Sequence, residues 1–103
     1  MVKDIESYDE WKFLINGSDI VVAEYWATWS GPCREISPNF AQVEEKHPHL
    51  KFVKVDVDSQ QDIAQEADVK TLPTFIAYKD GNAIRYVIGA NPQELNEFLH
   101  NCR

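Results

Sequence analysis

Apolar residues along the chain recur with two different spacings, and these spacings predict an alternation of strands and helices. Continuous or alternating runs of β-branched and aromatic residues predict five strands, at 2–5, 20–26, 52–57, 74–78 and 83–88. Apolar residues three and four positions apart predict four helices, which begin after Ser7, at Cys33, after Asp58 or Ser59, and after Asn91. The expected order is βαβαβαββα, an α/β fold in which a central mixed five-stranded sheet is flanked by four helices.

Short polar motifs indicate where these elements begin and turn. A capping residue followed three positions later by glutamate predicts the starts of the first and last helices, at Ser7 with Glu10 and at Asn91 with Glu94. Asp58 or Ser59 is expected to cap the third helix. Asp80-Gly81 suits a tight hairpin between the last two strands.

Chain length and charge limit the classes of function. With 103 residues, 44% of them hydrophobic, the chain can bury one core, and we expect a single domain over 1–103. The formal net charge of −7 disfavours nucleic acid and anionic membranes as partners, because both are bound through clustered Lys and Arg. No apolar stretch approaches the roughly 20 residues that span a bilayer. The acidic segment 1–6 lacks the features of a secretory or mitochondrial signal, so we expect a cytoplasmic protein that can also be nuclear.

The only two cysteines, Cys33 and Cys102, do not form a disulfide framework, and a reducing compartment would keep both as thiols. Together with His47 and His49 they show no metal-ligand spacing, so we expect no metal. Cys102 lies at the end of the last predicted helix. We expect it to be an exposed thiol that could link two molecules of an otherwise monomeric protein on oxidation.

The segment from Trp29 to Cys33 is the first candidate site. It follows a buried strand and begins a helix, the place where sheets of this kind carry their sites. Taken alone, Ser30, Gly31 and Pro32 are also residues that ordinary helix starts use, and Cys33 could be a small buried hydrophobic residue. The local sequence therefore leaves a redox site and a structural turn both open.

Three segments together resemble the thioredoxin family. AEYWATWSGPC at 23–33 resembles the active-site strand and loop of thioredoxins, VKTLPT at 69–74 resembles their cis-proline segment, and IGA at 88–90 is similar to their last strand and glycine turn. The segments stand at the family's spacing, and the resemblance runs from Val2 to Leu99. Within the family, the sequence most resembles thioredoxins of the eukaryotic cytosolic type. The resemblance implies the thioredoxin fold and protein thiol-disulfide exchange that needs no cofactor.

The resemblance also implies a role for each residue of the site. In the family, a cysteine at position 30 attacks a substrate disulfide, and the cysteine at the position of Cys33 then resolves the mixed disulfide. Ser30 removes that attacking sulfur, so the two-step exchange cannot run through this motif. The residues that would contact substrate are Trp29, Gly31, Pro32, Leu72, Pro73 in a cis peptide bond, Thr74, Gly89 and Ala90.

Glu24 is the one acidic residue in the predicted buried strand at 20–26. It occupies the position of the family's buried aspartate, which is thought to exchange protons with the inner cysteine. Burial should raise its pKa, so that Glu24 could act as a general base. The alternative is a structural acid paired with Lys54, which corresponds to the family's lysine on the neighbouring strand. Both alternatives stay open.

Two explanations account for Ser30. In the first, the parent protein carries cysteine at position 30 and reduces protein disulfides, a thioredoxin reductase flavoenzyme reduces it in turn, and Ser30 is an engineered change. In the second, the chain is a natural redox-inactive module that binds extended peptides between Trp29 and 72–74. The retention of the residues around Ser30 favours the first. Slow monothiol exchange through Cys33 ranks below both.

Overall fold

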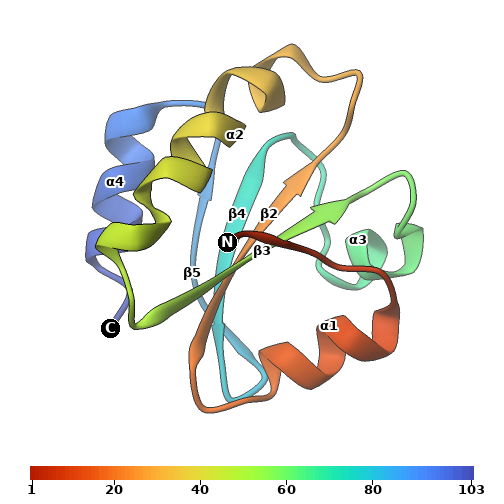
Figure 1. Cartoon of the computed structure of the whole chain (residues 1–103). Coiled ribbons are helices and arrows are strands. Elements are labelled where there is room, and N and C mark those ends of the chain that lie inside the picture. The colour runs from red at the N-terminus through yellow and green to blue at the C-terminus, as the bar shows by residue number, and fades with distance from the viewer.

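The computed structural model describes residues 1–103 and confirms the predicted βαβαβαββα order (Figure 1). The elements are β1 (Lys3–Asp4), α1 (Tyr8–Ile15), β2 (Ile20–Trp26), α2 (Gly31–Val43), a short 3-10 helix η1 (Glu44–Lys46), β3 (Leu50–Asp56), α3 (Gln61–Glu66), β4 (Thr74–Lys79), β5 (Asn82–Ile88) and α4 (Pro92–His100). None of the helices is both long enough and apolar enough to cross a membrane.

The five strands form one mixed sheet in the order β1-β3-β2-β4-β5. β1, β3 and β2 run parallel, as strands joined by helical crossovers do, and β4 and β5 run antiparallel to their neighbours. β2 lies at the centre, where Ala23 pairs with Val53 on one side and with Ile76 on the other. The segment that follows β2 therefore leaves the middle of the sheet.

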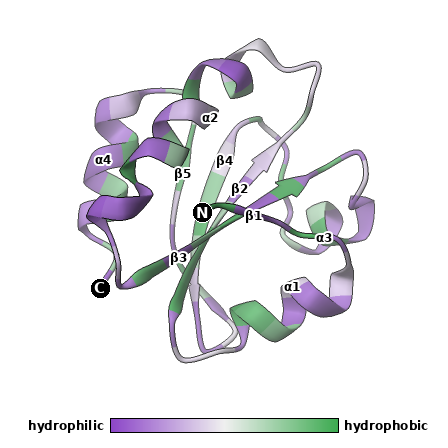
Figure 2. Cartoon of the chain, viewed as in Figure 1, coloured by the Kyte–Doolittle hydropathy of each residue, from purple (hydrophilic) through white to green (hydrophobic).

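Two apolar clusters cover the two faces of the sheet. Alternate residues of β2 point to opposite faces: Val22 packs in the cluster under α2 and α4, and Val21 packs in the cluster under α1 and α3. Phe40 of α2 stacks on Phe52 of β3 with ring centroids 4.4 Å apart. Figure 2 shows the helices carrying hydrophilic and hydrophobic residues in alternation, the pattern expected of helices that cover a sheet on one side only.

Side chains cap α1 and α4 as predicted. Ser7 Oγ accepts the amide of Glu10 at 3.1 Å, and Asn91 Oδ1 accepts the amide of Glu94 at 3.0 Å. The β4–β5 turn is also as predicted, because Asp80 and Gly81 both have positive φ values, 53° and 83°, which a two-residue hairpin of this hand needs.

The predicted cap of α3 is wrong. The N-cap residue is Gln60, and no side chain accepts a hydrogen bond there. Asp56, at the end of β3, instead accepts the amides of Asp58 and Ser59 at 2.9 and 3.3 Å. These two residues form a turn before the helix, so their side chains are not available at its first amides.

The prediction that Cys102 is exposed is also wrong. Its side chain is fully buried in the cluster under α2 and α4, and its Sγ donates to the carbonyl of Phe98 at 3.1 Å. Burial raises the pKa of the Cys102 thiol to about 11. The sequence carries the signal, since Leu95, Leu99 and Cys102 continue one apolar face at helical spacing.

Candidate functional site

Three predicted segments meet at one end of the sheet, beyond the carboxyl ends of β2 and β3. Because β4 is antiparallel to β2, its first residue Thr74 lies opposite Tyr25 near the end of β2, and Ile88 lies opposite Thr74. The Gly89 amide donates to the Pro73 carbonyl at 2.9 Å. The cis-proline segment and the glycine turn are thus neighbours beside the loop that leaves β2.

Ser30 is the N-cap residue of α2. Its Oγ accepts the Cys33 amide at 3.3 Å, and its carbonyl accepts the Arg34 amide at 3.2 Å. Pro32 in the first turn lacks an amide hydrogen at a position where none is needed. Only 5% of Ser30 and 1% of Cys33 are exposed. The one sulfur at the site is therefore shielded from solvent.

Trp29 is the exposed residue of the site, with 66% of its surface accessible. Its indole Nε1 donates to Asp58 Oδ2 at 2.8 Å, which ties the loop after β2 to the loop after β3. The Arg34 guanidinium donates to the Thr28 carbonyl at 3.0 Å and closes the same loop from the helix side. A large apolar ring held in a fixed position at the surface suits contact with another protein.

The Leu72–Pro73 peptide bond is cis, as the resemblance implies. Pro73 and Thr74 are buried, and the Thr74 hydroxyl donates to the Thr71 carbonyl. Across from them Gly89 has a φ of 105°, a backbone conformation that L side chains rarely adopt. Ala90 follows it and is half-buried.

Glu24 is fully buried on the face of the sheet that α2 covers. Its Oε2 accepts the Ser37 hydroxyl at 2.6 Å, and its Oε1 has no hydrogen-bond partner. Burial raises the pKa of the Glu24 carboxyl, and the Ser37 hydrogen bond and the charge of Lys54 act in the opposite direction. The net effect is that Glu24 binds its proton more tightly than an ordinary glutamate.

Lys54 lies directly across from Glu24 in the parallel register of β2 and β3. The five salt bridges of the protein do not include this pair. The Lys54 ammonium instead lies 4.4 Å from the centroid of the Trp26 ring. Lys54 thus acts on Glu24 through its charge and holds a cation–π contact with Trp26.

Sequence reasoning missed two residues of the site, Ser37 and Asp58. Ser37 stands four positions after Cys33, so helical spacing alone places both on one face of α2. Asp58 was expected to cap α3 and binds the Trp29 indole instead. No signal in the sequence separates these two uses of an aspartate in a loop.

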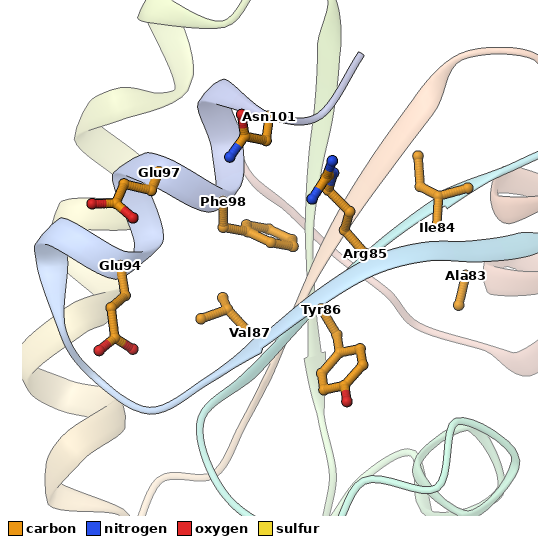
Figure 3. A pocket seen from close by; sticks show the side chains of 9 residues that line it. All are labelled: Ala83, Ile84, Arg85, Tyr86, Val87, Glu94, Glu97, Phe98 and Asn101. Carbon is orange, nitrogen blue, oxygen red and sulfur yellow. The ribbon is translucent and has the colours of Figure 1, made fainter.

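Two surface hollows lie along β5. One of about 530 Å³ lies between β5 and α4, where Val87 and Phe98 form its floor and Glu94 and Glu97 stand on the helix (Figure 3). It contains no residue of the site. The other, of about 520 Å³, includes Thr74 of the cis-proline segment. No group of three His, Cys, Asp or Glu side chains is placed to hold a metal ion.

The thioredoxin family model matches residues 3–101. The chain belongs to the thioredoxin family. It is 45% identical over 101 residues to thioredoxin of Coprinus comatus, covering 96% of this chain and 95% of that one. Its structure is similar to that of Malassezia sympodialis thioredoxin, with a TM-score of 0.94 and 40% identity over 96% of this chain and 90% of that one.

A Cys-to-Ser mutant of Entamoeba histolytica thioredoxin is also similar, with a TM-score of 0.91 and 33% identity over 99% of this chain and all of that one. Thioredoxins are thiol-disulfide oxidoreductases, and their substrates are disulfide-containing proteins. In this member, position 30 carries a hydroxyl, and the only sulfur of the motif is the buried Cys33.

Proposed function

We propose that this chain is a protein-disulfide reductase blocked in its first chemical step at Ser30, and that a cysteine at this position is the active form. The observation that carries the proposal is the placement of Ser30. It is the N-cap residue of α2, three positions before the buried Cys33 and next to the exposed Trp29. A serine hydroxyl is barely ionised at neutral pH and forms no disulfide, so it cannot replace an attacking thiolate.

The full reaction needs two sulfurs at the start of α2. A thiolate at position 30 attacks a substrate disulfide, which forms a mixed disulfide and releases the first substrate thiolate. Cys33 then attacks the sulfur at position 30, the mixed disulfide breaks, and the second substrate thiolate leaves. The substrate gains two electrons and the protein is left with a disulfide between positions 30 and 33.

The partners follow from this reaction. A thioredoxin reductase flavoenzyme would return the oxidised active form to its dithiol, so the protein itself needs no cofactor. We propose that the protein is a monomer of the cytoplasm. The buried Cys102 supports a monomer, because a buried sulfur is not available for a link between two molecules.

Reduction of insulin by dithiothreitol tests the proposal. We expect the chain with Ser30 to leave the rate of reduction by dithiothreitol unchanged within error. We expect the Ser30→Cys variant to catalyse the reaction about 10³-fold or more faster than any residual activity of the Ser30 chain, because it restores the nucleophile. Ser18→Cys is the matched control, since Ser18 is exposed and lies outside the motif. An inactive Ser30→Cys variant, or full activity with Ser30, contradicts the proposal.

The exposed Trp29 favours a second candidate function, a redox-inactive module that binds extended peptides. An apolar ring 66% exposed and fixed by Asp58 is a binding surface whether or not position 30 carries sulfur. Titration of the tryptophan fluorescence with a disulfide-containing peptide would measure binding by the Ser30 chain, because Trp29 is the one exposed indole of the three. Binding together with an inactive Ser30→Cys variant supports the module over the reductase.

A further inference from the structure

The hydrogen bond between Ser37 and Glu24 joins the helix of the site to the buried acid below it. Ser37 follows Cys33 by four residues in α2, so the two side chains lie on one face, about 6 Å apart along the helix axis. Ser37 Oγ is 2.6 Å from Glu24 Oε2. The hydroxyl that binds the carboxyl therefore stands about one helical turn after Cys33, on the same face of α2.

Ser37 supplies the only hydrogen bond that the Glu24 carboxyl receives, since Oε1 has none. The charged and titratable groups that face Glu24 from other elements do not replace it. Lys54 of β3 lies over the Trp26 ring, and Asp56 of β3 accepts backbone amides. On β4, the residue opposite Glu24 is the apolar Phe75. Orientation of the carboxyl toward α2 thus depends on one hydroxyl.

We propose that Ser37 is a positioning residue, whose hydroxyl holds the Glu24 carboxylate ready to accept the proton of Cys33 in the resolving step. The inference rests on the proposed function. In that step the proton of the Cys33 thiol passes to Glu24, and the Cys33 sulfur bonds to the sulfur at position 30. The bond from that sulfur to the substrate breaks, and the substrate leaves as a thiolate that solvent protonates.

The charge on the carboxylate explains why a single hydroxyl matters. A hydrogen bond to a charged acceptor is stronger than one between neutral groups, and an ionised carboxylate buried without one is costly. Without Ser37, both oxygens of Glu24 would lack a partner. The carboxyl would then hold its own proton over a wider pH range, and a protonated carboxyl cannot accept another.

Titration of the Glu24 side-chain carboxyl by carbon-13 NMR tests the contact in the chain as it stands, without any redox activity. We expect Ser37→Ala to lower the ionisation constant of Glu24 about tenfold, the loss expected for a hydrogen bond to a charged group. Ser37→Thr, which keeps the hydroxyl, should restore it. Gln42→Ala on the exposed side of α2 is the control and should leave it unchanged. An unchanged titration in Ser37→Ala overturns the inference.

The second arm measures the pH profile of insulin reduction in the Ser30→Cys background. We expect Ser37→Ala to move the rising limb of the profile to higher pH and Ser37→Thr to leave it in place, which a merely structural role would not do. A profile that does not move with Ser37→Ala overturns the positioning role. An inactive Ser30→Cys variant overturns the proposed function, and the titration of Glu24 still decides whether Ser37 holds the carboxylate.

Discussion

At the scale of single residues, Glu24 makes stability depend on pH. Its pKa is raised in the folded protein by burial, whereas in the unfolded chain it is near the ordinary value of 4.5. Between these two values the folded state binds more protons than the unfolded state. The contribution of Glu24 to stability is therefore present below the unfolded pKa and is lost as pH rises through the folded pKa.

We predict that Glu24→Gln raises the melting temperature relative to the parent at pH 8, because it removes a buried charge. The gain should shrink as pH falls through the folded pKa and vanish below about 4.5, the unfolded pKa, where the glutamate becomes neutral in both states. Calorimetry of both proteins across this range measures the difference. Glu45→Gln, at an exposed position, is the control. A gain that does not vary with pH contradicts the prediction.

The burial of Cys33 and Cys102 predicts a protein with almost no accessible thiol. A thiolate is the reactive species, and burial raises the pKa of Cys102 to about 11. We expect native Cys102 to react with a thiol reagent at least about a hundredfold more slowly than a free cysteine. Denaturation should release two thiols per chain.

Oxidised samples should accordingly run as monomers on a non-reducing gel. Ser18→Cys places a thiol at an exposed position and serves as the positive control for both reagent and oxidant. A disulfide-linked dimer of the parent chain that disappears in Cys102→Ala would show that the C-terminal turn opens in solution, and would contradict the burial seen in the structure.

The site residues that belong to a sequence motif were predictable. Those that join the site only through a contact in the folded chain were not. Trp29, Pro73 and Gly89 stand in segments that resemble the family, and the structure brings these segments to one end of the sheet. The partners Ser37 and Asp58 depend on how α2 and the loop after β3 are placed in space. Such long-range contacts leave no local pattern in the sequence.

At the scale of elements, the caps predict where stability can be removed. Asn91 Oδ1 accepts the Glu94 amide at the start of α4, so Asn91→Ala should lower the free energy of unfolding by about 1 kcal/mol. Gln60→Ala at the N-cap of α3 is the matched control, since no side chain caps that helix, and it should change stability little. Urea denaturation of the three proteins measures both values. Equal losses would contradict the role of the Asn91 cap.

Strands and helices were predictable because each has its own period in the sequence. The buried run of β2 and the Asp80-Gly81 turn are local signals, and the structure has both. The start of α3 was not predictable in this way. Asp58 and Ser59 are good capping residues, but Asp56 accepts their amides and holds them in a turn before the helix. The burial of Cys102 has two opposing signals in the sequence: proximity to the chain end indicates exposure, whereas apolar spacing after Leu95 and Leu99 indicates the core, and the structure has it in the core.

At the scale of the whole molecule, the net charge of −7 sets the response to salt. Acidic side chains repel one another in the compact state, and salt screens this repulsion. We expect the melting temperature to rise by roughly 3 °C as sodium chloride increases from about 0.01 M to about 0.15 M, which corresponds to about 0.5 kcal/mol. Glu45→Lys should reduce this dependence. A fall with salt would mean that surface ion pairs such as Lys12–Glu66 outweigh the repulsion.

The hydrogen bond from the Cys33 amide to Ser30 Oγ has a consequence for the balance between stability and activity. A serine at an N-cap contributes about 1 kcal/mol to a helix, whereas sulfur is a weak acceptor. A thioredoxin with cysteine at position 30 gives up part of this stabilisation at the residue that must react. If the proposed function holds, the hydroxyl oxygen that caps α2 is the atom whose replacement by sulfur would restore disulfide exchange.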